Sequence, residues 1–416
     1  MSQRSFREMD VSKYFCPIVN VNRLISFSYV TNCTSNNYRS MFHVCLAAVL
    51  LTVHGIQVHH YIPDASYDAH NFNVTLIGEP TMIECSTPPC FNPSLVELPA
   101  SLAISLAPNA RYLAAWRFNL AESLCRNLAS PRRQGRRRLG MRTFMALLDE
   151  HFETVAPIVT TNGLFMDLHM VDVRLESHGS TLLVHGMSYH HGSMFWTLSQ
   201  LTLGADEKGM VHCNLSSLTH PDVHQSTLRN YGKNLGVLWS GDPDVPFRIM
   251  YWLKSPNHAG VYRGLPPLAT ASEISKLPPL YLDGYPAHNN ISPIDLAPEH
   301  PGLYLGVMHT HWDTVLPAHV RKINATYYGN TYMSYFFVMR DIEPNEVIAI
   351  SAPFCFPSRF QSSRCDIIQF ITSIERLASD PGVLLVSYGI NDCESAIVKL
   401  QLSHVLQFAL TGARKW

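Results

Sequence analysis

Residues Leu303–His309 read LYLGVMH, a short apolar run that contains an aromatic and a β-branched residue. Pro301 and Gly302, which favour turns, come immediately before it. A short run of this composition, bounded by turn formers, is typical of a β-strand. This stretch therefore predicts a strand that ends at a histidine.

The same pattern recurs on both sides of this stretch along the chain. The other runs that it predicts as strands are Asn73–Ile77, Ala110–Arg117, Thr181–Gly186, Met194–Leu198, Phe247–Leu253, Tyr332–Met339 and Val383–Tyr388. Few segments show a sustained helical period; the best is Met141–His151, and we expect a single helix there. Many short strands without a dividing linker predict an all-β fold, a five-bladed β-propeller over residues 60–416.

Composition excludes several classes of protein. The 416 residues include 31 Lys and Arg against 32 Asp and Glu, a formal net charge of −1. A nucleic-acid partner is therefore not expected, because such binders carry a basic footprint. Charged residues make up 15% of the chain, below the roughly 25% of ordinary soluble domains, which argues against a coiled coil or extended disorder.

The first 58 residues differ from the rest of the chain. Residues 1–40 are polar and aperiodic and are interpreted as a tail, while residues 41–58, MFHVCLAAVLLTVHGIQV, have a strongly apolar centre. We interpret this segment as a signal anchor, which predicts single-pass anchoring in a Golgi or ER membrane of the secretory pathway, with a lumenal catalytic domain. The alternative is a buried strand or helix of the domain.

Glycosylation sequons and cysteines also bear on whether the chain enters the secretory pathway. Five Asn-x-Ser/Thr sequons occur, at Asn32, Asn73, Asn214, Asn290 and Asn324, and they suggest a glycoprotein. Ten cysteines are present; the pairs Cys85 with Cys90 and Cys355 with Cys365 are spaced to close small loops. Connectivity is not readable from one sequence, and free buried thiols remain the alternative.

Polar residues recur beside the apolar runs, about once per expected blade. In chain order they lie in Asn92-Pro-Ser, at Arg117, in Val171-Asp172-Val-Arg174, Lys233-Asn234, His288-Asn289-Asn290-Ile-Ser292, Met308-His309-Thr-His311 and Ser387-Tyr388-Gly-Ile-Asn391-Asp392. Propellers gather polar groups of successive blades at one mouth of their channel. The recurrence predicts a ring-shaped site.

The order of these motifs resembles that of glycoside hydrolase family 130, the mannoside phosphorylases and their β-1,2-mannosyltransferase relatives. The later part is closest, with Tyr304-Leu-Gly-Val-Met-His309, Ile350-Ser-Ala-Pro-Phe-Cys-Phe-Pro357 and Val386-Ser-Tyr-Gly-Ile-Asn-Asp392. The resemblance spans roughly residues 88–410 and implies a five-bladed propeller. The chain departs from the family at Val171 and Val173, where the family has Glu and Pro.

The resemblance also implies roles for single residues. Asp172 is the candidate general acid or base, with a bond to Arg174 as the structural alternative. The candidate substrate-binding residues are Arg117, Arg174, Lys233, Asn234, His309, Tyr388 as a stacking face, and Asp392. Strand-end ion pairs and turns are the alternatives for all of them.

The function predicted from this resemblance is a glycosyltransferase or glycoside phosphorylase that acts on mannose-type glycosides by inverting displacement. No cofactor is expected, and inorganic phosphate or a sugar donor is the co-substrate. His309 and His311 alternate on one strand, but the sequence offers no third metal ligand at matching spacing, so no metal is expected.

Two alternatives remain open. A hydrolase of the same fold needs a second carboxylate, for which Asp167, Glu176, Asp283 and Asp392 are candidates. The other alternative is a non-catalytic, lectin-like propeller.

Overall fold

A computed structural model gives the arrangement of much of the chain. It describes residues 76–83, 90–119, 141–159, 170–190, 193–218, 234–239, 247–254, 258–263, 270–271, 279–282, 285–313, 330–341, 345–358, 361–365, 368–390 and 394–411. The chain divides into two compact units, Met1–Thr52 and Val53–Trp416. All described residues belong to the second unit.

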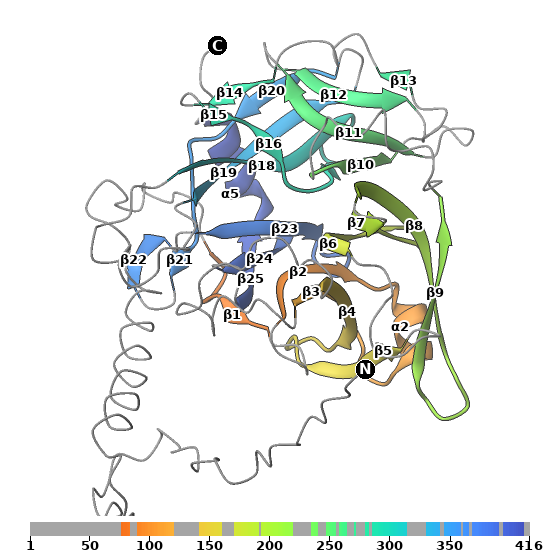
Figure 1. Ribbon diagram of the computed structural model, residues 1–416. Coiled ribbons are helices and arrows are strands. Elements are labelled where there is room, and N and C mark those ends of the chain that lie inside the picture. Colours follow the sequence, from red (N-terminus) through yellow and green to blue (C-terminus); the bar gives the residue numbers. More distant parts are fainter. Residues whose placement is uncertain are drawn as a thin grey trace, which may run out of the picture. The chain divides into compact units, whose positions relative to one another are not determined.

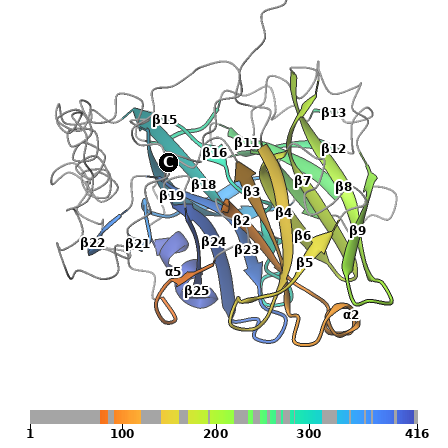
Figure 2. The ribbon, with the colours of Figure 1, turned by 60° about the horizontal axis from the view of Figure 1, so that its bottom comes forward.

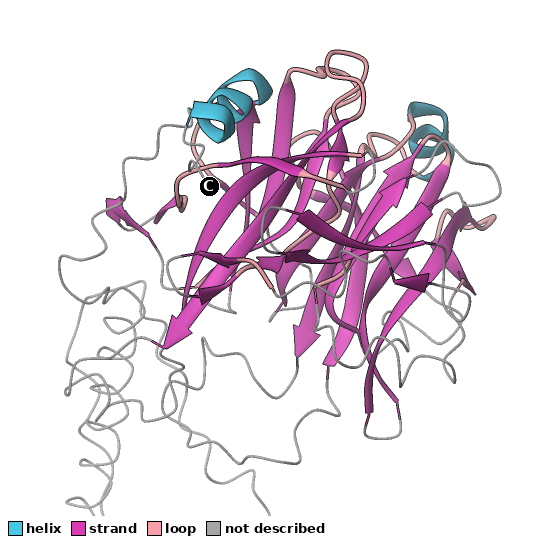
Figure 3. Ribbon diagram, turned by 90° about the horizontal axis from the view of Figure 1, so that it is seen from above, coloured by secondary structure: helices cyan, strands magenta, loops and turns pink. Residues whose placement is uncertain are grey.

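Strands dominate this unit (Figures 1 and 3). The first nine are β1 (Thr81–Met82), β2 (Cys90–Glu97), β3 (Tyr112–Asn119), β4 (Met141–Leu148), β5 (Thr154–Val159), β6 (Met170–His178), β7 (Thr181–His190), β8 (Ser193–Ala205) and β9 (Val211–Ser217). The next eight are β10 (Gly236–Trp239), β11 (Phe247–Lys254), β12 (His258–Arg263), β13 (Thr270–Ala271), β14 (Tyr281–Leu282), β15 (Tyr285–Pro286), β16 (His288–Asn289) and β17 (Ile294–Asp295). The last eight are β18 (Leu303–Asp313), β19 (Asn330–Arg340), β20 (Val347–Ile350), β21 (Pro357–Ser358), β22 (Gln361–Cys365), β23 (Gln369–Arg376), β24 (Val383–Ile390) and β25 (Glu394–Gln401).

The sheets are antiparallel meanders. One eight-stranded sheet runs β2-β3-β4-β5-β9-β8-β7-β6, and only its β5–β9 junction is parallel. Further sheets run β10-β11-β12-β13, β16-β18-β19-β20 with β17 also on β18, and β1-β25-β24-β23. The all-β class expected from the sequence is confirmed.

Two helices are described beside these sheets. Helix α2 (Ala100–Leu106) links β2 to β3, and α5 (Leu402–Thr411) follows β25. In α5 the buried residues are Leu402, Val405, Phe408 and Ala409, a spacing that places them on one helical face. This face packs on β19, β20 and β25.

The expected helix at Met141–His151 is wrong, because Met141–Leu148 forms strand β4. Strand β4 lies between β3 and β5, and every residue from Thr143 to Leu148 is buried. A strand buried on both faces does not alternate polar and apolar residues, so its apolar run imitates a helical period.

Serine side chains form hydrogen bonds between segments that are not paired as neighbouring strands. Strand β2 contacts both β6 and β23, and the three lie close together in two views (Figures 1 and 2). The buried Ser94 Oγ accepts the backbone N–H of Leu175 at 2.8 Å, and Ser373 Oγ accepts that of Leu95 at 2.9 Å. A third such bond, 2.7 Å long, joins Val237 N–H to Ser292 Oγ. Each bond satisfies a buried N–H that strand pairing leaves without a backbone acceptor.

The polar tail and the predicted signal anchor, residues 1–40 and 41–58, lie outside the described residues. Among the helices that the structure describes, none is long and apolar enough to cross a membrane.

We expect Ser94→Ala to lower the free energy of unfolding by about 1–3 kcal/mol, because the Leu175 N–H would lose its acceptor in a buried position. Chemical denaturation of the full chain measures this change. Ser105→Ala is the matched control, since its hydroxyl is exposed on α2. Equal effects of the two substitutions would contradict the structural role of Ser94.

Candidate functional site

Two irregularities in strand pairing determine the geometry of the candidate site. The β2–β3 register shifts between Phe91 and Ser94, and the β6–β7 register shifts between Val171 and Arg174. The intervening Asn92 and Asp172 have φ angles of 51° and 53°, in the left-handed region. Asn and Asp tolerate this region better than most residues, but such a conformation still costs roughly 1 kcal/mol. Strain of this kind concentrates at functional sites.

The Asp172 carboxylate lies within hydrogen-bonding distance of two donors from the neighbouring strands. Asn92 Nδ2 donates to Asp172 Oδ1 at 3.1 Å, and Arg117 Nη1 lies 3.4 Å from the same oxygen. The side chains of Arg117 and Asp172 are 17% and 11% exposed. The Arg117 guanidinium also lies over the ring of Phe91, 5.1 Å from its centroid. This carboxylate is therefore partly desolvated and held by charge-assisted bonds.

Arg174 is buried and binds main-chain carbonyls. Its Nε donates to the carbonyl oxygen of Asn290 at 2.8 Å, and its Nη1 donates to that of Asp172. Its guanidinium lies 5.1 Å from the ring centroid of Phe370. Burial lowers the pKa of Arg174 to about 10, and the nearby carboxylates Asp172 and Glu176 oppose this shift. Arg174 thus stabilises the irregular backbone of β6 at which Asp172 lies.

His309 lies in a cluster of rings at the paired ends of β16 and β18. His288 is its cross-strand partner, with ring centroids 5.4 Å apart, and Tyr332 stacks on it at 5.1 Å. His311 lies 5.2 Å from His288. Burial, followed by the charge of His311, lowers the pKa of His288 to about 4. Burial also lowers the pKa of His309 well below its usual value, so His288 and His309 are both uncharged near neutral pH.

Tyr388 does not fit the expected role of a stacking face. It is 1% exposed and packs in the core, where the centroid of its ring lies 4.8 Å from that of Phe356. The adjacent Gly389 has a spatial role instead: a Cβ at this position would lie 1.8 Å from Asn92 Oδ1. In this Tyr-Gly pair, Tyr388 is thus a core residue, and Gly389 leaves room for the Asn92 side chain because it has none of its own.

The remaining predicted residues are only partly described. Asn234 precedes β10, and its buried Oδ1 has no hydrogen-bond partner. Gly236, two residues further on, lies against Asn289 and Ile291. Lys233 and Asp392 lie outside the described residues. The structure therefore brings together Arg117, Asp172, Arg174 and, through Asn290, His309.

Three residues of this arrangement were not predicted as site residues. Asn92, His288 and Asn290 stand in the recurring polar motifs, which is the signal that could have selected them. Asn290 was also expected as a glycosylation sequon. It is 0% exposed and forms hydrogen bonds with Arg174, Ile371 and His309, so its amide is not accessible for attachment of a glycan.

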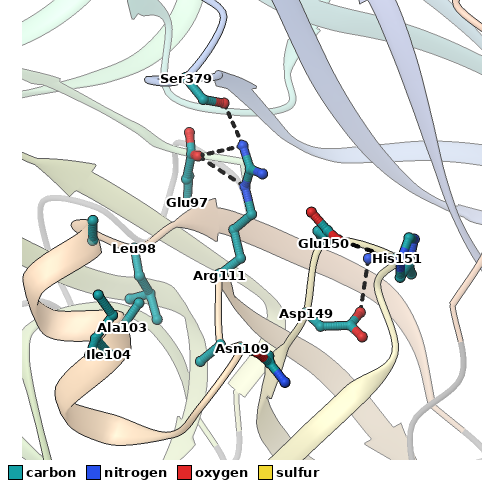
Figure 4. Close-up of a pocket in the computed structure, with 12 residues that line it drawn as sticks. Glu97, Leu98, Ala103, Ile104, Asn109, Arg111, Asp149, Glu150, His151 and Ser379 are labelled. Carbon is teal, nitrogen blue, oxygen red and sulfur yellow. Dashed lines mark hydrogen bonds and ion pairs between the residues drawn. The ribbon is translucent and has the colours of Figure 1, made fainter.

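A cavity of about 660 Å³ lies at the other end of β2, beside Glu97 (Figure 4). Arg111 there pairs with Glu97 at 3.2 Å and donates to Ser379 Oγ, and the His151 N–H donates to Asp149 Oδ1 at 2.9 Å. None of the predicted site residues lines this cavity.

Metal ligation was also considered. Within the described ranges, no group of three or more His, Cys, Asp or Glu side chains is placed to hold a metal ion. The three clustered histidines are held instead by ring contacts and, for His309, by Asn290.

No known protein family and no curated protein matches this chain. Solved structures similar to it include a mannose phosphorylase from Leishmania mexicana in complex with phosphate ion, at 13% identity and a TM-score of 0.44, covering 79% of this chain and 89% of that one. A GDP-Man-dependent mannosyltransferase from Leishmania mexicana has 13% identity, a TM-score of 0.44, and coverage of 79% and 91%. A beta-1,2-mannobiose phosphorylase from Listeria innocua has 12% identity, a TM-score of 0.42, and coverage of 83% and 99%.

We expect Gly389→Ala to lower the free energy of unfolding by about 1–3 kcal/mol, because the new methyl group would overlap the Asn92 amide. Thermal or chemical denaturation of the full chain measures the change. Gly204→Ala is the control, since nothing lies within 4 Å of its added Cβ. A Gly389→Ala protein as stable as this control would show that the Asn92 amide can move away.

Proposed function

We propose that the chain is a carbohydrate-active enzyme, a glycosyltransferase or glycoside phosphorylase for mannose-type glycosides, built as a five-bladed propeller. The antiparallel meanders support this fold, as do the serine hydrogen bonds that connect β2 to β6, β2 to β23, and β10 to the segment between β16 and β17. The pairing of β1 with β25 supports it further, because an early strand then completes the last sheet.

One observation carries the functional proposal. The Asp172 carboxylate meets Asn92 and Arg117 at a strained bulge, at the position where the motif order places a catalytic aspartate. An enzyme that transfers a glycosyl group needs a positioned acid or base at the glycosidic oxygen. Asp172 fits this requirement, because its main chain is fixed by Arg174 and its side chain by its neighbours.

The proposed reaction is an inverting displacement. In the synthetic direction, the Asp172 carboxylate accepts the proton of the acceptor hydroxyl as its oxygen attacks the anomeric carbon and the donor's leaving group departs from the opposite face. In the reverse direction, the acid form of Asp172 returns this proton to the leaving oxygen while phosphate or another nucleophile attacks. The bonds from Asn92 and Arg117 stabilise the ionised form between these steps.

A hydrolase of the same fold needs a second carboxylate about 6.5–9.5 Å from the first for inversion. Glu176 lies four residues further along β6, roughly 13 Å away at the usual rise per strand residue. The Glu176 carboxylate is also bonded elsewhere, because its Oε1 lies 3.0 Å from His185 Nε2. The other candidates, Asp167, Asp283 and Asp392, lie outside the described residues. Of the four candidates, Glu176 is the one that the structure describes, and its place along β6 and its bond to His185 do not suit the second carboxylate of an inverting hydrolase.

We expect Asp172→Asn to lower turnover of a mannosyl donor by about 10²–10⁴-fold, because the amide cannot transfer the proton. Asn tolerates the left-handed backbone equally well, so the fold should be kept. The assay uses the full chain, with and without inorganic phosphate. Phosphate dependence of the wild type separates a phosphorylase from a transferase.

Asp206→Asn, in an exposed hairpin turn, is the matched control and should keep full activity. Unchanged turnover in Asp172→Asn would rule out its catalytic role. Sugar binding without turnover by the wild-type chain would favour the lectin-like alternative.

We also propose that the chain resides in the secretory pathway, anchored by residues 41–58. Support comes from Cys90 and Cys355, each of which is disulfide-bonded. Disulfides persist mainly in oxidising compartments.

We expect the full chain to stay in the membrane pellet after alkaline extraction, because an apolar span resists it. Replacement of Leu50 and Leu51 by Arg should release the chain, since charge in a membrane span is costly. Release of the unaltered chain into the soluble fraction would disprove the anchor.

A further inference from the structure

Asn290 joins three elements of the candidate site. Its backbone oxygen accepts a bond from Arg174 Nε at 2.8 Å, and its side-chain Nδ2 donates to the carbonyl oxygen of Ile371 at 3.2 Å. Its Oδ1 is bonded to Nδ1 of His309. The side chain is fully buried, so no solvent competes for these bonds.

These partners fix the orientation of the Asn290 amide. The Ile371 carbonyl can only accept a hydrogen bond, so the amide must present its NH₂ group there. Its oxygen therefore faces His309. An exchange of the two amide atoms would place two oxygens against each other in a buried position, and would lose a hydrogen bond.

The orientation of the amide decides which nitrogen of His309 carries the proton. Because Asn290 Oδ1 has no hydrogen to donate, Nδ1 of His309 must be the donor. A neutral imidazole carries one proton, so its Nε2 is then a bare acceptor.

The surroundings of His309 keep it neutral. They comprise His288 on β16, His311 on the same strand, Arg174 on β6, Tyr332 on β19 and Phe370 on β23. Burial above all, and then the charges of His288, His311 and Arg174, lower the pKa of His309 well below its usual value.

We propose that Asn290 is a positioning residue that fixes the Nδ1–H tautomer of His309, so that Nε2 accepts a hydrogen bond from a neutral hydroxyl of the bound ligand. A deprotonated oxygen of a phosphate or carboxylate next to His309 Nε2 would meet the lone pair of this nitrogen, with no hydrogen between the two atoms. The identity of the ligand as a saccharide rests on the proposed function. The tautomer of His309 does not depend on it.

Nitrogen NMR of the full chain with ¹⁵N-labelled histidine tests the tautomer directly. The ring nitrogens of His309 are those whose signals disappear in His309→Gln. We expect the bare nitrogen to couple strongly to both carbon-bound ring protons, which is the pattern of Nε2. A bare nitrogen coupled strongly to only one of them would be Nδ1 and would overturn the proposal.

Three variants separate positioning from packing. Asn290→Ala should give a mixture of both tautomers and a fall of roughly tenfold or more in kcat/KM, since one positioned hydrogen bond is worth about 1.4 kcal/mol or more. Asn290→Asp keeps an acceptor towards Nδ1 and should restore the tautomer, although it loses the donor to Ile371. Asn289→Ala removes a neighbouring buried amide that has no partner, and should leave His309 unchanged. A lower unfolding temperature of Asn290→Ala with an unchanged tautomer would reduce Asn290 to a packing role.

Two probes test the ligand chemistry. Mannose should shift the Nε2 signal of wild-type His309 without protonating it, and inorganic phosphate at the same concentration should not. Protonation of Nε2 by phosphate, or no response to either probe, would refute the hydroxyl assignment. Failure of the catalytic role of Asp172 would appear in turnover alone and leave the tautomer readout intact.

Discussion

The close approach of Asn92 and Asp172 is the contact on which the candidate site depends. Both residues lie in register shifts of adjacent strands and have left-handed backbones, which turn their side chains towards each other. Regular pairing of β2 with β3 and of β6 with β7 would place alternate side chains on opposite faces. Backbone irregularity is therefore what brings Asn92, Arg117 and Asp172 together, and Gly389 leaves the necessary space.

A second layer of bonds holds this irregular backbone. The carbonyl oxygen of Asp172 would be a buried acceptor without a strand partner, and Arg174 supplies the donor. The same guanidinium binds the carbonyl of Asn290, whose amide reaches Ile371 and His309. Burying a cation costs free energy unless its donors are satisfied, and here main-chain oxygens accept from its Nε and Nη1. The charge of Arg174 thus stabilises the fold of the site rather than a bound anion.

Much of the strand content could be predicted from short apolar runs, because β3, β7, β8, β11, β18, β19 and β24 each overlap a predicted run. Strand β4 could not, since burial on both faces removes the alternation that distinguishes a strand. Motif positions correctly drew attention to Asp172 and Arg174. They could not reveal the bulges, because a register shift depends on partner strands far away in sequence. For the same reason Asn290 was given no role of its own in the site, and Tyr388 was given an exposed role although it is a core residue.

The balance of charge around Asp172 bears on what such a site can bind. Arg117 lies beside the carboxylate and offsets its charge, Arg174 donates to main-chain carbonyls, and burial lowers the pKa of both His288 and His309. Arg174 keeps its charge, so among these described groups two arginines stand against the single carboxylate of Asp172, and both arginines already have partners. Binding of a phosphate dianion would need a further cation to compensate its desolvation. Among the predicted site residues, Lys233 could supply this charge, and it lies outside the described residues.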